Sequence, residues 1–227
     1  MASGAFRFIK LICRDRTALS RVSLRQRRCA SSSSGSSGFS LLTPTNLNDI
    51  VKLEVLMQEP SDRIKEIWSE YHTVNKSGLQ ICGNLDTRMD QLLRAKGKES
   101  PMFVFPVFKG CDDQYMVLFS QFQENMFILT YLEEYKRNPA SAQPWMQITL
   151  YDELVKEKAI GLYRADFIPN LNKAESTLIL KMLFDVYSDE VMYNSHVLTF
   201  NKHPEQFNFK KYFDVVKKMA VTVTEDS

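Results

Sequence analysis

Apolar residues recur at helical spacing in two long stretches, one near each end of the chain. The first stretch opens at Pro60-Ser61 and places four residues at positions i, i+3, i+4 and i+7: Ile64, Ile67, Trp68 and Tyr71. The second stretch covers Leu171–Tyr187, where Asn172 and Glu175 have the spacing of a capping box. Weaker signals predict two further helices, over residues 84–97 with Asn84 as N-cap and over 209–219. Residues 151–158 are predicted to form a short charged helix or a turn.

The middle of the chain is rich in the β-branched and aromatic residues that favour strands. Seven segments have this composition: Leu79–Cys82, Met102–Phe108, Gln114–Phe122, Asn125–Leu132, Trp145–Leu150, Ala159–Ala165 and Met192–Phe200. The third and fourth segments flank a tight polar turn, which predicts an antiparallel hairpin. Strands joined by short turns, with helices at either end, indicate an α+β fold: a mainly antiparallel β-sheet with α-helices packed on it, in a single domain.

The length of 227 residues suits one domain. We assign residues 41–221 to that domain and 222–227 to a frayed tail. A domain of this size buries roughly 70% of its unfolded surface, so it needs no disulfide or metal to hold a core. No apolar run approaches the roughly 18 residues of a spanning helix, so no membrane span is predicted.

The formal net charge of +2 hides an asymmetry. Residues 1–40 contain seven arginines, one lysine and a single acid, a net charge of +7, and the remaining residues contain 21 basic and 26 acidic groups, a net charge of −5. The first forty residues also hold ten serines and end in a Ser/Gly-rich run over 31–38, which is expected to be disordered. The acidic domain argues against nucleic acid as a partner.

Five arginines share one face of a predicted N-terminal helix: Arg7, Arg14, Arg21, Arg25 and Arg28. An Arg-rich, Ser-rich and acid-poor amphipathic N-terminus is typical of a mitochondrial transit peptide. A chloroplast transit peptide is the main alternative, and a basic arm that binds nucleic acid is a weaker one. Residues 1–40 are therefore predicted to engage an import receptor, to be cleaved within residues 28–37, and to direct the protein to the mitochondrial matrix.

The sequence contains no familiar motif for catalysis or for binding a cofactor. Gly97-Lys98 lacks the spacing of a phosphate-binding loop, and the cysteines and histidines lack the spacing of a metal site. Ser195 and His196 are neighbours, but adjacent strand residues point to opposite faces, so we interpret His196 as a partly buried histidine of the sheet. His72 is interpreted as a C-terminal helix cap. No catalytic, cofactor-binding or metal-binding residue is predicted.

Four blocks of the sequence carry a resemblance to a known family: Ile64–His72, Pro101–Pro106, Tyr115–Phe122 and Thr199–Phe207. In order and spacing they resemble the mitochondrial assembly chaperones of the F-type ATP synthase, specifically the family that binds the catalytic beta subunit. The resemblance covers about residues 47–216. One departure is a short linker before the domain, where animal and fungal members of the family have a longer charged helical region.

The resemblance implies a stoichiometric holdase rather than an enzyme. It would bind the unassembled beta subunit, shield its alpha-facing surface, and be displaced during assembly of the catalytic sector. This work needs no cofactor, only a surface matched to an exposed apolar interface. A sheet face left uncovered by helices would be the preferred client surface. Because aromatic residues are enriched in binding hot spots, six are candidate partner contacts, although their spacing is also that of core residues: Trp68, Tyr71, Phe103, Phe105, Phe127 and Tyr131.

Two other functions stay open from the residues alone. A small organellar enzyme would require an unrecognised site near His196 or Cys111, with convergent polar groups in a deep pocket. An RNA-binding matrix factor would require a basic face on a domain whose net charge is −5.

Overall fold

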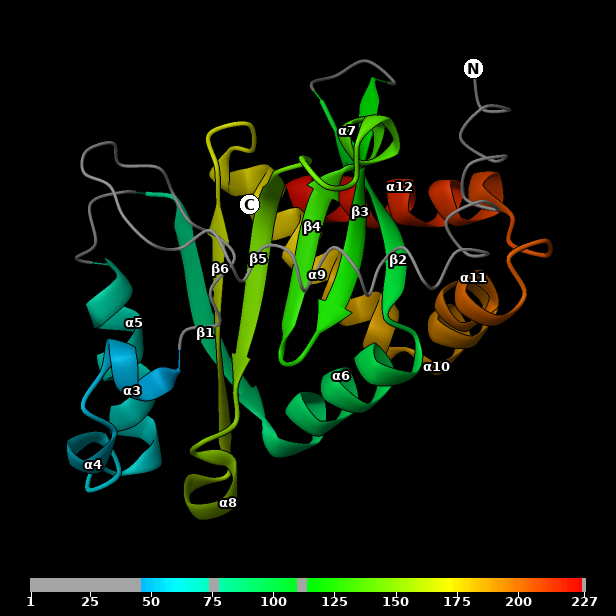
Figure 1. Ribbon diagram of the computed structural model, residues 1–227. Coiled ribbons are helices and arrows are strands. Elements are labelled where there is room, and N and C mark those ends of the chain that lie inside the picture. The colour runs from blue at the N-terminus through cyan, green and yellow to red at the C-terminus, as the bar shows by residue number, and fades with distance from the viewer. Residues whose placement is uncertain (1–45, 74–77, 110–113, 226–227) are drawn as a thin grey trace.

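A six-stranded sheet forms the centre of the computed structural model, which describes residues 46–73, 78–109 and 114–225 (Figure 1). The strands are β1 (Gln80–Asp86), β2 (Met102–Phe108), β3 (Tyr115–Gln123), β4 (Met126–Tyr131), β5 (Pro144–Tyr151) and β6 (Ile160–Phe167). They lie in the order β1-β6-β5-β4-β3-β2, so β1 and β2 are the edges. All neighbouring strands are antiparallel, which confirms the predicted α+β fold with one antiparallel sheet in a single domain.

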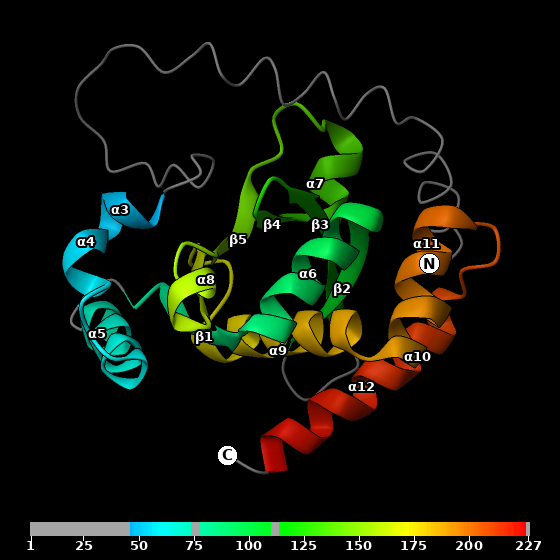
Figure 2. The same ribbon diagram turned by 90° about the horizontal axis from the view of Figure 1, so that it is seen from below.

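Four long helices pack on or beside the sheet: α5 (Ser61–Thr73), α6 (Thr87–Glu99), α9 (Lys173–Ser188) and α12 (Phe209–Glu225). The turned view shows α9 and α12 together on one side of the sheet, with α5 at the β1 end (Figure 2). The remaining helical segments are short: α3 (Leu47–Ile50), α4 (Leu53–Leu56), α7 (Leu132–Arg137), α8 (Val155–Lys158), α10 (Glu190–Met192), the π-helical segment η1 (Tyr193–Leu198) and α11 (Thr199–Lys202).

The face of the sheet that looks toward α9 carries the larger part of the core. Phe103 of β2 meets three aromatic rings from the C-terminal helices and their connection, with centroids 4.9–6.0 Å away: Phe200, Phe207 and Tyr212. On β4, Phe127 lies 5.2 Å from the ring of Tyr187 in α9. Burial of these large aromatic side chains supplies much of the apolar driving force for packing the helices on this face.

A second, smaller core cluster lies on the opposite face, near β1. Trp68 of α5 is 1% exposed and packs edge-to-face on Tyr151 of β5, with ring centroids 5.7 Å apart. The indole N–H of Trp68 donates to the Tyr163 carbonyl at 3.2 Å. Leu47 and Leu56 of α3 and α4 belong to the same cluster. The closely spaced apolar residues between Leu47 and Leu56 thus belong to a segment with two single-turn helices, each of which buries one leucine.

Several predicted elements are confirmed. The predicted hairpin is β3–β4, and Glu124 in its turn adopts φ 56°, a left-handed backbone. The capping box at the start of α9 is present, because the Asn172 side chain accepts from the Glu175 N–H at 2.8 Å and the Glu175 carboxylate accepts from the Asn172 N–H at 2.9 Å.

The predicted strand over Met192–Phe200 is wrong, because this segment is helical in α10, η1 and α11. Its β-branched and aromatic composition concealed a helical period. The buried side chains lie at i, i+3, i+4 and i+7: Tyr193, His196, Val197 and Phe200. The interpretation of His196 as a sheet residue is corrected accordingly.

The boundary between β1 and α6 also differs from the prediction. Asn84 pairs with Leu162 inside the sheet, and Asp86 is the N-cap, accepting from the Met89 N–H at 2.7 Å. The strand therefore runs four residues further than predicted. Gly97 does not stop α6, which continues to Glu99. Its lack of a side chain serves packing, since a Cβ at Gly97 would lie 2.8 Å from the ring of Phe122.

Candidate partner-binding surface

The two candidate contact residues on α5 differ in their exposure. Trp68 is in the smaller core cluster, whereas Tyr71 is 49% exposed and touches His72 edge-to-face at 5.1 Å. His72 Nδ1 donates to the Trp68 carbonyl at 2.9 Å, so it satisfies a carbonyl of the last helical turn as the sequence predicted. Burial lowers the pKa of His72, with Arg164 as a further cause, which favours the neutral ring. Tyr71 alone of this group is available at the surface.

Three of the four sheet candidates lie in the core of the α9 face. Phe103, Phe105 and Phe127 have no exposed surface. Tyr131 is half-buried and stacks on Trp145 with ring centroids 5.0 Å apart. The structure thus gathers Phe103, Phe105 and Phe127 under the helices. Tyr71 and the partly exposed Tyr131 are therefore the candidate contacts that a partner could reach.

Exposed large apolar side chains come from four different elements of the described structure: Val55 of α4, Tyr71 of α5, Tyr115 of β3 and Val191 of α10. The highest exposure among them is 75%, at Val191. Tyr115 packs its ring 4.5 Å from Phe213 of α12, so only part of it is free for a partner. Val55 on α4 and Tyr71 on α5 lie at the β1 end of the sheet, while Val191 lies on α10, away from them (Figure 1).

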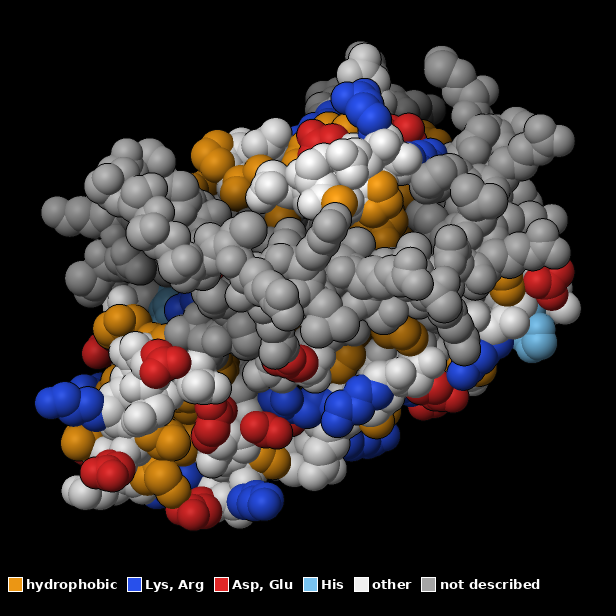
Figure 3. All heavy atoms as spheres, in the orientation of Figure 1, with side chains coloured by type: hydrophobic (Ala, Val, Ile, Leu, Met, Phe, Trp, Pro, Cys, Tyr) orange, Lys and Arg blue, Asp and Glu red, His pale blue; other side chains and the backbone are white. Residues whose placement is uncertain are grey.

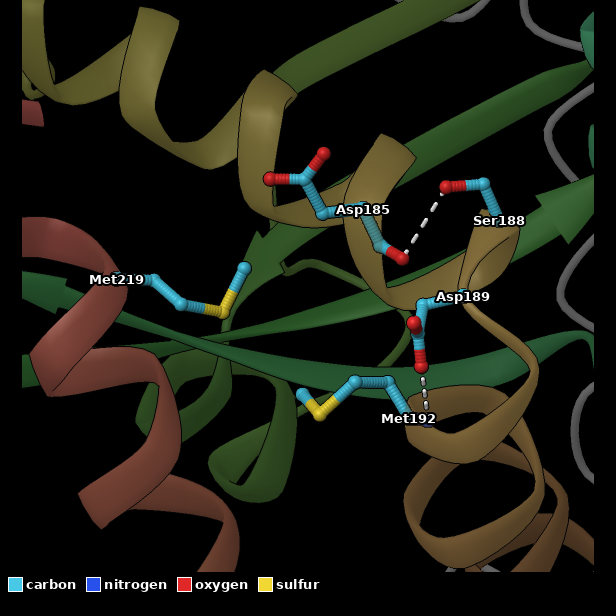
Figure 4. Close-up of a pocket in the computed structure, with 5 residues that line it drawn as sticks. All are labelled: Asp185, Ser188, Asp189, Met192 and Met219. Atoms are coloured by element: carbon cyan, nitrogen blue, oxygen red, sulfur yellow. Dashed lines mark hydrogen bonds between the residues drawn. The ribbon is translucent and has the colours of Figure 1, made fainter.

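A shallow pocket of about 390 Å³ lies next to Val191, where α9, α10 and α12 meet. It is lined by Asp185, Ser188, Asp189, Met192 and Met219. In Figure 4 the two thioether side chains extend toward the space between the helices. The Ser188 hydroxyl donates to the Asp185 carbonyl, and the Asp189 carboxylate accepts from the Met192 N–H at 2.7 Å. Burial raises the pKa of Asp185.

The side chains that line this pocket are better suited to non-covalent binding than to catalysis. The described residues that line the pocket include no histidine, cysteine or lysine that would pair with Ser188 as a base. Its carboxylates and thioethers fit a side chain with an apolar stem and a positive end. Among the described residues, no group of three or more His, Cys, Asp and Glu side chains could hold a metal ion.

A network of hydrogen bonds ties the end of α6 to the helical segment after α9. The Tyr193 hydroxyl donates to Glu99 Oε2 at 2.9 Å and lies 3.0 Å from the Ser100 hydroxyl. Lys96 Nζ bonds Glu190 at 3.0 Å and sits 4.3 Å above the Tyr193 ring. Burial raises the pKa of Tyr193 to about 12, so its phenol stays protonated and remains a donor. We assign these residues a structural role.

His196, the candidate for an enzymatic site, also contributes to packing. It is buried in η1 and its ring lies 5.3 Å from the ring of Tyr212. Burial lowers the pKa of His196. The neighbouring Ser195 hydroxyl donates to the Val191 carbonyl, so this serine is bonded to backbone within its own helix. Cys111, the other candidate, lies outside the described residues.

A buried charge pair lies within α6. Asp90 is 1% exposed and accepts from Arg94 Nε at 2.9 Å. Burial raises the pKa of Asp90, and Arg94 opposes that shift. A Cβ at Gly161 would lie 2.9 Å from the Asp90 side chain, so this glycine permits α6 to approach β6 closely. The Asp90 side chain therefore packs directly against the backbone of β6.

The charge distribution bears on the RNA-binding alternative. Over α6 and α8 on the face drawn in Figure 3, basic and acidic side chains are interspersed. The salt bridges among the described residues include Arg63–Glu66, Lys109–Glu175 and Arg164–Asp166, which pair basic groups with acids. The part of this face over α6 and α8 thus lacks the segregated positive charge that a nucleic-acid surface requires.

Comparison with known families now adds to this geometry. A model of the ATP11 protein family matches residues 17–212, most of the chain. The chain belongs to this family, the assembly factors of the mitochondrial F1-ATP synthase. A search of curated proteins finds no match to the chain. Membership assigns the protein a role in assembling ATP synthase and a mitochondrial setting. Among the described residues, every helix is too short or too polar to cross a membrane.

Proposed function

We propose that this protein is a stoichiometric chaperone that binds the unassembled catalytic beta subunit of ATP synthase in the mitochondrial matrix. The family match over residues 17–212 carries the proposal, since it assigns the assembly role. The four sequence blocks that resemble beta-subunit chaperones support the choice of client. Exposed apolar side chains on the described surface could contact a protein partner. His196, the histidine considered for an enzymatic site, is buried and packs against Tyr212.

The mechanism requires only competition between two protein surfaces. The chaperone covers the apolar surface through which the beta subunit later contacts an alpha subunit, and so prevents aggregation. Release follows when the alpha subunit binds the beta subunit more tightly than the chaperone does. Each 1.4 kcal/mol difference between the two binding free energies changes the ratio of the alpha–beta complex to the chaperone–beta complex about tenfold. Nucleotide hydrolysis by the chaperone is not needed for this exchange.

The proposal is tested by adding the purified domain, residues 41–227, to isolated beta subunit diluted from denaturant. We expect light scattering to fall as the molar ratio approaches one chaperone per beta subunit, and alpha subunit to release the chaperone. Isolated alpha subunit serves as the matched control client. If the domain failed to bind beta subunit and did not reduce its aggregation, the proposed client would be wrong.

We also propose that residues 1–40 are a cleaved transit peptide. The five arginines that the sequence places on one face of a predicted helix would provide the positive charge that the membrane potential draws toward the matrix. Import into isolated mitochondria tests this, with a variant in which Arg7, Arg14, Arg21, Arg25 and Arg28 are replaced by Gln. Loss of import and of processing in that variant is expected, and import at the unchanged rate would overturn the proposal.

A further inference from the structure

The outer edge of β1 presents backbone groups that have no partner in the sheet. The Phe167 N–H donates to the Leu79 carbonyl at 3.1 Å, so residues 79, 81, 83 and 85 turn their backbone groups toward β6. The alternate residues Cys82 and Asn84 therefore turn their N–H and C=O groups away from the sheet. In the described part of the chain, no hydrogen bond involves these backbone groups.

The strand is also the most accessible one of the sheet. Of its seven residues only Leu85 is buried, whereas β2 at the other edge is buried along nearly its whole length. Natural proteins protect edge strands with proline, charge or a covering element, because an open edge pairs readily with another strand. Between Ile81 and Leu85, β1 contains neither a proline nor a charged residue.

Apolar side chains flank this edge on the α9 face. Ile81, Tyr163 of β6 and Phe184 of α9 are half-buried, and the Tyr163 and Phe184 rings are 5.2 Å apart. Gly83 has no side chain, and a Cβ there would lie 2.5 Å from the Tyr163 hydroxyl. The Tyr163 side chain thus lies against the backbone of β1, close to the edge. An added strand would place every second side chain beside these apolar groups.

We propose that β1 is a strand-pairing site, at which an extended segment of the client adds to the sheet as a seventh strand. The unpartnered N–H and C=O groups would bind the client backbone, and the apolar residues would select a segment with apolar side chains at alternate positions. This inference rests on the proposed function, because the beta subunit is the client. It adds the mode of recognition and the chemical character of the segment recognised.

A proline at position 84 tests the proposal, because it removes an outward N–H that the sheet does not use. The opposite edge already contains such a proline, Pro106. The residue before it would be Gly83, which is extended as a residue preceding proline prefers. Asn84→Ala is the matched control, since it removes the same side chain and keeps the N–H. We measure the binding of each variant to beta subunit, and compare thermal unfolding to establish that each is folded.

We expect Asn84→Ala to bind as the natural chain does and Asn84→Pro to bind about tenfold more weakly. Equal binding by both variants would overturn the pairing site and leave the chaperone function intact. Failure of all three proteins to bind beta subunit would instead overturn the function on which the inference rests. A concentration-dependent dimer abolished by Asn84→Pro would also overturn it, by showing that β1 pairs with a second copy.

Hydrogen exchange keeps the test decisive if Asn84→Pro does not fold. In the unmodified chain, the amides of Cys82 and Asn84 should exchange rapidly alone and at least tenfold more slowly with beta subunit bound. Protection confined to other elements, such as α10 and α12, would contradict strand pairing.

Discussion

The two edge strands of the sheet, β2 and β1, differ in whether their outward backbone groups are covered by other parts of the described chain. At the β2 edge, the Asn201 side chain of α11 accepts from the Met102 N–H at 3.1 Å and donates to the Met102 carbonyl at 2.6 Å. Pro106, at another outward position, has no N–H to offer. At the β1 edge, the outward backbone groups of Cys82 and Asn84 are bonded by no side chain of the described residues, and neither residue is a proline. One edge is closed by the fold, and the other keeps its capacity to pair.

The C-terminal aromatic cluster explains why the β2 edge stays closed. Phe103 inserts among Phe200, Phe207 and Tyr212, so the helices that follow α9 are held against β2. Asn201 occupies its place because α11 is fixed by this packing. The β1 edge has no comparable clamp, because α5 packs on the face of the sheet opposite α9. There the Trp68 indole N–H bonds the carbonyl of Tyr163 in the neighbouring strand β6.

The largest expected effect comes from breaking the closed edge at its core. Phe103→Ala should destabilise the domain by about 3–5 kcal/mol, because it removes a fully buried ring and leaves a cavity. Urea unfolding followed by circular dichroism measures this loss. The control is Tyr71→Ala on the exposed side of α5, for which we expect a change within about 0.5 kcal/mol. Similar losses in both variants would contradict the assignment of Phe103 to the core.

Removing the polar clamp should have the next largest effect. Asn201→Ala leaves the Met102 N–H and carbonyl without their partner and should destabilise the domain by about 1–3 kcal/mol. Amide exchange at Met102 should accelerate more than exchange in β4, because the loss is local. The exposed neighbour offers a control, since Lys202→Ala should leave both quantities unchanged. A stability equal to that of the unmodified chain would show that β2 is closed without Asn201.

Much of this architecture follows from short-range patterns in the sequence. The i, i+3, i+4, i+7 spacing around Trp68, the capping box at Asn172 and the polar turn at Glu124 each act within a few residues, so they could be predicted. The predicted strand after α9 is wrong because β-branched and aromatic composition favours a strand, whereas the helical period of Tyr193, Val197 and Phe200 decides the structure.

The exposure of the candidate contacts could not be predicted, for a different physical reason. Trp68 and Tyr71 are both aromatic residues of one helix, and only the packing of α5 on β1 decides that the first is buried and the second exposed. The open edge likewise depends on the strand order, which brings β1 to the outside although five other strands follow it along the chain. Long-range pairing of this kind leaves no local signal in a single sequence.

A smaller effect is expected at the open edge itself. Gly83→Ala should destabilise the domain by about 1 kcal/mol, the low end for overpacking, because the Tyr163 side chain can turn away from the new methyl group. In a Tyr163→Leu background, the same substitution should have little effect, and a double-mutant cycle of thermal unfolding measures the difference. Equal effects in both backgrounds would show that the Tyr163 side chain is not the reason why position 83 requires a glycine.

The smallest expected effect is the pH dependence of stability that arises from two buried histidines, His72 on α5 and His196 on η1. The folded pKa of each is lowered, mainly by burial, with Arg164 adding to the effect at His72 and Lys211 at His196. Below about pH 6.5 these histidines therefore bind protons in the unfolded chain that they do not bind in the folded chain. Stability is complete above that pH and falls on acidification, by no more than about 0.8 kcal/mol per histidine between pH 7.5 and 6.

Subtraction isolates the contribution of each histidine to this pH dependence. Asp90 and Asp185, whose pKa is raised by burial, act in the opposite direction at lower pH, so the total curve alone is ambiguous. The difference in urea midpoints between pH 7.5 and 6 should shrink in His72→Gln and shrink again in the double variant with His196→Gln. In His72→Gln the new side-chain amide can still donate to the Trp68 carbonyl, so the local cap is preserved while the titrating group is lost. An unchanged difference in His72→Gln would show that the His72 ring is hydrated and protonates freely in the folded chain, which its 8% exposure argues against.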